Sequence, residues 1–170
     1  MSTTAVQNGP ALAQPSRSES HRRGLAIRFA LAALTVAFSY LFRRELLRFL
    51  TSEANLRLDL LAGIHLQRIS GDTVMWKGVL YQYQNPCTFV DVWFGSIPLL
   101  WEARRRLAWN LGFMAAVAMA MFCFNVFRLS VSDVIFAAGV PWNLAHNVIS
   151  GVSYFAVWVW IWSRLRAPTA

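Results

Sequence analysis

The chain has 170 residues, of which 56% are hydrophobic and only 14% are charged, and its formal net charge is +8. A soluble domain carries about 25% charged residues, so this composition, with several long charge-free runs, excludes an ordinary soluble domain and favours an integral membrane protein. The positive charge does not indicate a nucleic-acid partner, because the Arg residues lie at the ends of apolar runs, where they orient a membrane protein and contact lipid headgroups.

The N-terminal part is expected to form a disordered cytoplasmic tail over residues 1–23, because it is polar and lacks a periodic apolar face. The apolar run that follows predicts a first spanning helix over residues 24–43. No convincing small-residue cleavage site follows it, so we interpret it as an uncleaved signal anchor. Arg28 lies one turn inside this helix, and its long side chain is expected to reach the headgroups.

The next segment, residues 44–85, is mixed and polar and is expected to lie outside the cytoplasm. Its first part, 43–61, predicts an amphipathic helix at the membrane interface, since leucines recur at helical spacing: Leu46, Leu47, Leu50, Leu58 and Leu61.

The second part of this segment predicts a small β-hairpin. The turn signal at Gly71 separates two stretches that alternate, His65–Ile69 and Thr73–Tyr83. Tyr81 and Tyr83 would share one face of the second strand, because side chains in a strand alternate.

Three further spanning helices are predicted over residues 86–102, 107–128 and 142–163, with a cytoplasmic tail over 164–170. The first of them is short, and Pro141 divides the long apolar stretch before the last, leaving 134–140 as an interfacial segment and Asp133 in a link. The predicted fold class is therefore an all-α integral membrane bundle of about four transmembrane helices with a small extracytoplasmic β-hairpin.

The distribution of Arg residues predicts that both termini are cytoplasmic. The Arg-rich N-terminal tail and the triplet Arg104-Arg105-Arg106 would lie inside, although the bias is weak and the inverted topology stays open. This orientation places Cys87, Arg128 and His146 at one depth on the outer side of the plasma membrane.

Cys87 follows Asn85 and Pro86, which are favoured at the N-cap and the first position of a helix. A thiol in the first helical turn has a lowered pKa and is a better nucleophile, because free N–H groups and the helix dipole favour the anion. Asp91, one turn later, would oppose this unless a cation neutralises it. Cys123, deep in an apolar run, is expected to be inert; a Cys87–Cys123 disulfide stays open.

Arg128 and His146 supply the other candidate groups. Asn125 lies three residues before Arg128 and so projects from the same helix face, and a guanidinium there could hold a thiolate or an oxyanion. His146 lies in an apolar run beside Asn147 and could act as a general acid and base. No cofactor and no metal site is expected, because the His, Cys and Asp residues lack the spacing of metal ligands.

A Cys at the start of one span, Asn125-Val126-Phe127-Arg128 closing the next, and Ala145-His146-Asn147 opening the third resemble the exosortase/archaeosortase family. The resemblance covers residues 61–162 and implies a short member of that family of membrane-embedded cysteine transpeptidases. Such enzymes cleave the C-terminal sorting signals of membrane-anchored protein substrates. Cys87 would be the nucleophile, Arg128 the anion-stabilising residue and His146 the acid and base, supported by Asn125, Asp91 and Asn147. The chain departs from the family at Thr88-Phe89, where small residues usually follow the Cys.

Two other functions are compatible with the same sequence. The chain could be a non-enzymatic membrane subunit of an export or polysaccharide assembly complex, in which Cys87 is inert. It could also be a small-molecule or ion carrier, although internal repeats and paired broken helices are missing from the sequence. An enzyme requires Cys87, Arg128 and His146 to converge on one cavity.

Overall fold

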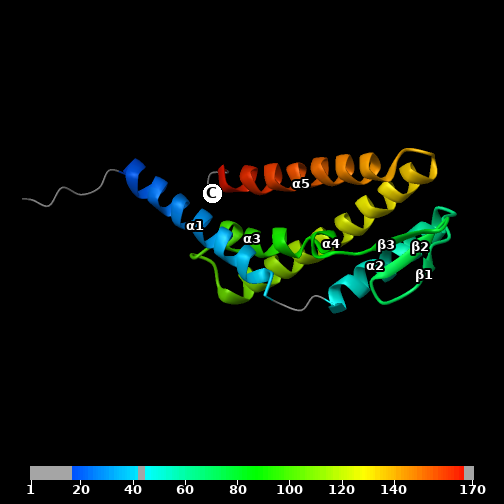
Figure 1. The fold of residues 1–170 in the computed structure, drawn as a ribbon. Helices are drawn as coiled ribbons and strands as arrows, with labels where there is room; N and C mark the ends of the chain where they lie inside the picture. Colours follow the sequence, from blue (N-terminus) through cyan, green and yellow to red (C-terminus); the bar gives the residue numbers. More distant parts are fainter. Residues whose placement is uncertain (1–16, 42–44, 167–170) are drawn as a thin grey trace, which may run out of the picture.

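The computed structural model describes residues 17–41 and 45–166. Within them the chain is mostly helical, with a small sheet at one end of an elongated molecule (Figure 1). The elements, in chain order, are α1 (Arg17–Ser39), α2 (Glu45–Leu61), β1 (Gln67–Arg68), β2 (Thr73–Trp76), β3 (Val79–Gln82), the 3₁₀ turn η1 (Asn85–Thr88), α3 (Val90–Leu100), α4 (Leu107–Ala137) and α5 (Trp142–Arg166).

Two helices, α4 and α5, are long and apolar enough to cross a membrane. In the most apolar windows of these helices only 22% and 17% of the residues are buried within the protein, so most of their apolar surface is left uncovered. They correspond to the predicted spans at 107–128 and 142–163. Neither α1 nor α3 combines that length with that hydropathy, since α3 has only 11 residues.

Several predicted boundaries were wrong. Residues 17–23 are the first turns of α1 rather than a disordered tail, and residues 164–166 continue α5. Helix α4 extends nine residues past Arg128 to Ala137, so Asp133 lies within a helix and not in a link, and most of the segment 134–140 is helical too. The remaining predicted tail residues, 1–16 and 167–170, and the end of the predicted first span, 42–43, lie outside the described residues.

The sheet has three strands rather than two. Its order is β1-β2-β3, both pairs are antiparallel, and Met75 faces Leu80 in the second pair. The stretch Thr73–Tyr83, predicted as one strand, contains a second tight turn at Lys77 and Gly78, where φ is 48° and 80°. Two consecutive residues with positive φ form the turn that matches the twist of a two-residue hairpin.

Helix α2 confirms the predicted amphipathic helix, but its polar face is the one that packs on the protein. Its buried residues are all polar: Thr51, Ser52, Asn55 and Asp59. The leucines that were expected to mark the apolar face are mostly exposed, among them Leu46, Leu50 and Leu61. A helix with polar groups inside and leucines outside is the arrangement expected where the surroundings are apolar.

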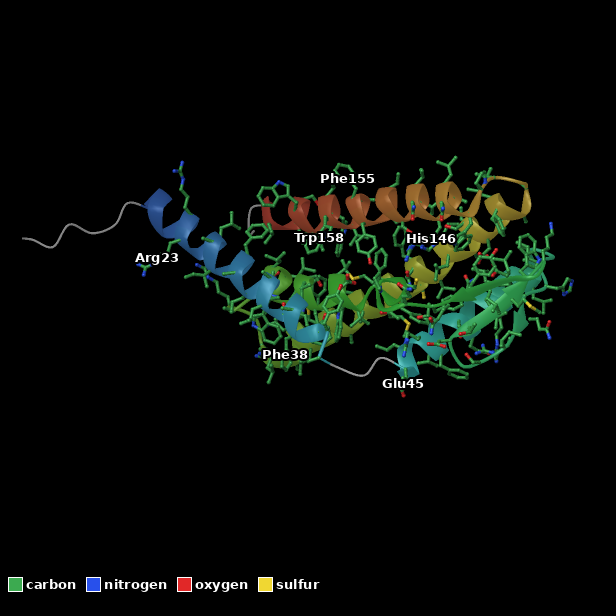
Figure 2. The ribbon with its side chains drawn as sticks, viewed as in Figure 1. Arg23, Phe38, Glu45, His146, Phe155 and Trp158 are labelled. Atoms are coloured by element: carbon green, nitrogen blue, oxygen red, sulfur yellow. The ribbon has the colours of Figure 1, made fainter. Side chains whose placement is uncertain are left out.

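Helices α1, α3 and α5 meet closely at Gly95. A Cβ atom on Gly95 would lie 2.8 Å from Val36 Cγ2 and 3.2 Å from the ring of Trp158, so only glycine lets the helices approach this far. Figure 2 shows Trp158 on the side of α5 that faces the other helices and Phe155 on the opposite side. Arg28, predicted to reach the headgroups, donates to the backbone carbonyl of Leu99 at 3.2 Å. This packing fixes the position of α3. The segment that precedes α3 is held in the interior as a result.

Candidate active site

The turn η1 places Cys87 next to α4 and α5. Cys87 lies in a 3₁₀ turn capped by Gln84, and the chain then passes through Phe89 in the left-handed conformation, with φ 57°, before α3 begins at Val90. The prediction that Cys87 occupies the first turn of an α-helix was therefore wrong, and the dipole of α3 does not act on the thiol as proposed from the sequence.

Packing holds this unusual turn in place. A bulky residue with positive φ is strained, and it keeps this conformation only where the surrounding structure holds it. Phe89 is only 1% exposed, and its ring centroid lies 4.4 Å from that of Tyr154 and 6.2 Å from that of Phe124. The Tyr154 hydroxyl also donates to the backbone carbonyl of Pro86 at 2.9 Å. Contacts from α4 and α5 therefore keep the backbone around Cys87 fixed.

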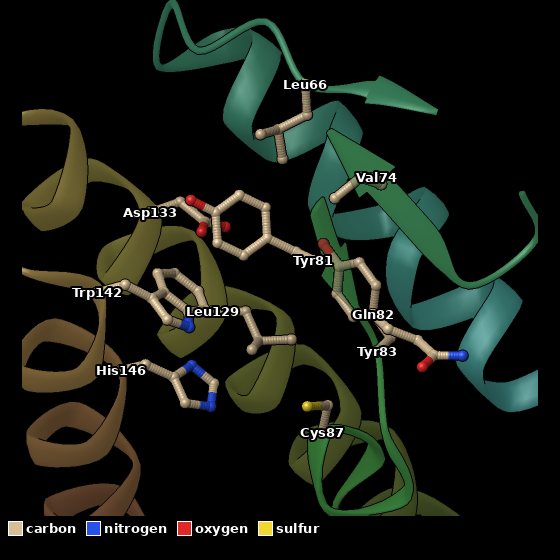
Figure 3. A pocket seen from close by; sticks show the side chains of 10 residues that line it. All are labelled: Leu66, Val74, Tyr81, Gln82, Tyr83, Cys87, Leu129, Asp133, Trp142 and His146. Atoms are coloured by element: carbon tan, nitrogen blue, oxygen red, sulfur yellow. The ribbon is translucent and has the colours of Figure 1, made fainter. Parts of the chain in front are cut away.

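Cys87 and His146 line the same small cavity, although 59 positions separate them in the sequence. The cavity has a volume of about 40 Å³, room for a few water molecules. Figure 3 shows the sulfur of Cys87 on the side of the residue that faces the His146 ring. The other lining residues come from the sheet and its flanks and from α4 and α5: Leu66, Val74, Tyr81, Gln82, Tyr83, Leu129, Asp133 and Trp142.

Burial raises the pKa of the Cys87 thiol, contrary to the lowered pKa expected from the sequence. Two influences act against burial: a hydrogen bond with the backbone of Gln84 and the positive charge of Arg128. The negative charge of Asp133 acts in the same direction as burial. The resting thiol is thus held in its protonated form, and a base is needed to ionise it.

Arg128 lies beside this turn and does not line the cavity, so only two of the three residues that were expected to converge on one cavity do so. Its side chain is buried, with Nε donating to Asn125 Oδ1 at 3.0 Å and one terminal nitrogen donating to Ser150 Oγ at 2.6 Å. The guanidinium carbon lies 4.9 Å from the centre of the Phe89 ring. Asn125 in turn donates to the backbone carbonyl of Cys87 at 2.6 Å, so Arg128 is connected to the cysteine through one amide.

His146 contributes its imidazole ring to the wall of this cavity. Its ring stacks on Trp142, with centroids 4.8 Å apart and planes 23° apart. Its Nδ1 atom is buried and finds no hydrogen-bond partner among the described residues. A ring nitrogen without a fixed partner, on a side chain that lines a cavity, can bond a group that enters that cavity.

The three supporting residues differ in their placement. Asn125 is fully buried and links Arg128 to Cys87. The charge of Asp91 acts on Arg128. Asn147 is exposed and does not line the cavity, so the structure does not bring it to the others.

Sequence reasoning missed the carboxyl groups on the far side of the cavity. Asp133 lines the cavity, and it contacts Asn55 of α2, which also contacts Asp59. The signal was present for Asp133, since an acidic residue inside a long apolar run is costly and is usually functional. Asp59 carried no such signal, because it lies in a polar segment.

The accessibility of the two cysteines predicts selective labelling. Both cysteines are free thiols. Cys87 lines the cavity, whereas Cys123 is exposed on the apolar surface of α4. A membrane-impermeant maleimide should label Cys87 and leave Cys123 unmodified in intact cells, because a charged reagent does not enter hydrocarbon. Mass spectrometry of the labelled peptides measures this, with permeabilised, detergent-solubilised protein as the control in which both react. Labelling of Cys123 alone in intact cells would contradict the placement.

Within residues 17–41 and 45–166, no group of three His, Cys, Asp or Glu side chains could hold a metal ion. The expectation that no metal or cofactor is needed stays a prediction. Comparisons of the chain with models of known protein families, with curated proteins and with solved structures found no match.

Proposed function

We propose that this chain is a membrane-embedded cysteine acyl-transfer enzyme, similar to the exosortase/archaeosortase transpeptidases, that cleaves C-terminal sorting signals of membrane-anchored proteins. One observation carries the proposal: Cys87 and His146, which are distant in sequence, line one cavity. The charge of Arg128 acts on the thiol from beside that cavity. A thiol, a base and a nearby cation are the groups that acyl transfer through a thioester requires.

The reaction begins with transfer of the Cys87 proton to His146. The sulfur attacks the carbonyl carbon of the substrate peptide, and the positive charge of Arg128 stabilises the negative charge that develops. The C–N bond then breaks, and His146 returns the proton to the leaving amine. An acceptor amine, hydroxyl or water next attacks the thioester, and its proton passes to His146. The C–S bond then breaks, and His146 returns this proton to the sulfur, which restores the thiol.

We also propose that the protein is a multi-pass protein of the plasma membrane, with α1 and α3 embedded beside the two long helices. In Figure 1 the described start of α1, the described end of α5 and the α3–α4 link lie toward one end of the molecule, and the sheet lies at the other. The link carries Arg104, Arg105 and Arg106, which favours the cytoplasm for that end. The cavity next to the sheet would then open toward the outer side.

This orientation predicts opposite signals from two reporter fusions. A reporter fused after residue 170 should act as a cytoplasmic protein, and one inserted at Gly71, in the exposed turn between β1 and β2, should act as an external one. The measurement uses two enzymatic reporters, one that is active only in the cytoplasm and one that is active only outside it. Each reporter is placed at both positions, and the two activities are compared. A cytoplasmic signal from the Gly71 insertion would contradict the outward placement of the cavity.

The thioester gives a direct test of the function. Wild-type protein co-expressed with a membrane-anchored substrate that carries a C-terminal sorting signal should form an adduct with it. Hydroxylamine should release the adduct, because it cleaves thioesters, and peptide mapping should place it on Cys87. If no substrate with such a signal forms an adduct or is shortened, the acyl-transfer function is contradicted and the non-enzymatic membrane subunit is favoured.

A further inference from the structure

A hydrophobic groove between α4 and α5 takes no part in the acyl transfer proposed above. Its volume is about 420 Å³, against about 40 Å³ for the cavity that Cys87 lines. The residues that line it lie within 116–124 of α4 and 156–160 of α5, and all of them are hydrophobic. Binding sites are mostly apolar and have volumes of about 300–1,000 Å³. We call this feature the α4–α5 groove and ask what fills it.

The α4–α5 groove is the part of this helix pair that α3 leaves uncovered. Val92 of α3 shares one hydrophobic core with Met114 of α4 and Ile161 of α5, so α3 packs against both helices. In the groove, by contrast, Phe124 is 38% exposed and Trp160 is 36% exposed. The groove therefore leaves room for one more element to pack against α4 and α5.

Small residues in the lining favour a helix as that element. Ala116 and Ala120 lie one helical turn apart on α4, and Ala156 of α5 lines the same groove. All three alanines are exposed. Helices in a membrane associate through small residues, because these let the two backbones come close together. The stretch from Ala116 to Phe124 is about 12 Å long, which accommodates about two turns of a helix.

One end of the α4–α5 groove reaches the turn that carries Cys87. The ring centroid of Phe124 lies 6.2 Å from that of Phe89, which follows Cys87 by two residues. Along α4 the groove ends at Phe124, and the cavity begins five residues later at Leu129. In the orientation proposed above, the groove thus lies on the cytoplasmic side of the cavity. A substrate that is held at Cys87 and continues into the membrane would run along it.

We propose that the α4–α5 groove binds the membrane-spanning helix of the anchored substrate, while the peptide bond that precedes this helix lies at Cys87. The proposal rests on the proposed function, because that function requires a substrate with such an anchor. Lipid chains and a second copy of this protein are the competing occupants. Neither of them requires a groove that ends beside the Cys87 turn, and the experiments below distinguish all three.

Photo-crosslinking identifies the occupant directly. Benzoylphenylalanine replaces Trp160 in the full-length protein in membranes, and Cys87→Ala is present so that no adduct forms. The probe is the membrane-anchored substrate of the thioester experiment, whose anchor is a C-terminal helix of about 20 apolar residues. Position 160 should crosslink to that helix. The control places the same group at Phe155, which is 71% exposed on the opposite side of α5 (Figure 2).

Three results of this experiment would overturn the proposal. They are crosslinks from position 160 to lipid alone, crosslinks to a second copy of the chain, and crosslinks to the probe in the same yield as from position 155. The last result would mean that the probe meets the protein only by chance in the membrane.

Ala120→Leu tests the same contact by narrowing the groove. The probe concentration that gives half-maximal crosslinking from position 160 should rise roughly tenfold, because the added methyl groups overpack the contact. Ala115→Leu is the matched control, since Ala115 is also exposed on α4 but does not line the groove. It should leave the half-maximal concentration unchanged. Equal values in Ala120→Leu and Ala115→Leu would contradict the proposal.

The state of the cavity is checked in Ala120→Leu with Cys87 retained. Labelling of Cys87 by iodoacetamide, a small neutral reagent, should match the wild type. If the labelling differs, the comparison of positions 160 and 155 decides the proposal alone.

Failure of this proposal and failure of the proposed function give different results, because crosslinking in Cys87→Ala requires no chemistry. An adduct on Cys87 together with equal crosslinking from positions 160 and 155 would contradict the groove alone. A crosslink from position 160 to the probe's helix without any adduct in the wild type would contradict acyl transfer alone.

Discussion

Replacement of Cys87 by alanine is expected to abolish both the substrate adduct and the shortened product. The reaction has no other nucleophile at this cavity, since the remaining lining groups near the sulfur are a base, a carboxyl and two neutral phenols. Loss of the nucleophile of a covalent hydrolase costs on the order of 10⁶-fold in rate, below what a gel of processed substrate detects. Cys87→Ser should also be inactive, because a hydroxyl is far less acidic than a thiol.

Cys123→Ala is the matched control for this experiment. It removes the other thiol of the chain from the exposed surface of α4 and should leave processing unchanged. Protein levels in the membrane fraction establish that each variant is inserted. Processing that persists in Cys87→Ala and disappears in Cys123→Ala would contradict the assignment of the nucleophile.

Arg128→Lys is expected to lower the rate of adduct formation roughly 10²–10³-fold, the usual cost of losing one group that stabilises the transition-state charge. The guanidinium bonds Asn125 and Ser150 at the same time and lies over the ring of Phe89. An ammonium is a point charge without this planar fork, so lysine cannot keep all three contacts. The rate of adduct formation, followed at several substrate concentrations, separates a slower reaction from weaker binding.

Arg105→Lys is the control, because Arg105 also lies over an aromatic ring, that of Trp109, but at the exposed α3–α4 link. The Arg105→Lys variant should form the adduct at the same rate as the wild type. Iodoacetamide labelling of Cys87 in Arg128→Lys then shows whether the cavity is intact. A normal rate of adduct formation in Arg128→Lys would show that the guanidinium acts only on the fold.

The helices could be predicted where charge and proline mark their ends. The triplet ending at Arg106 precedes α4, and Pro141 precedes α5, so both starts agreed with the sequence. The end of α4 did not agree with the sequence, because an Arg that follows an apolar run, as Arg128 does, usually marks the point where a span reaches water. Here the guanidinium is satisfied inside the protein, and the helix continues to Ala137.

The local structure around Cys87 could not be predicted, because it depends on tertiary packing. Asn85 and Pro86 are typical of a helix start, and nothing in the sequence indicates that Phe89 takes a positive φ. The rings of Phe124 and Tyr154, which hold Phe89, come from other helices. The order of the helices predicted that Cys87, Arg128 and His146 would meet at one cavity, and only Cys87 and His146 line it. The burial of Asp59 could not be predicted, because it depends on how α2 packs on α4.

The polar inner face of α2 has a consequence for how its attachment responds to cooling. Where docking removes apolar surface from water, the large heat-capacity change makes the attraction weaken in the cold. Docking α2 encloses Thr51, Ser52, Asn55 and Asp59 instead, and the heat-capacity change for polar groups has the opposite sign. Hydrogen bonds of Asn55 to Asp133 and of Ser130 to Asp59 therefore hold this helix, and its attachment keeps its strength at temperatures where contacts that rest on the hydrophobic effect weaken.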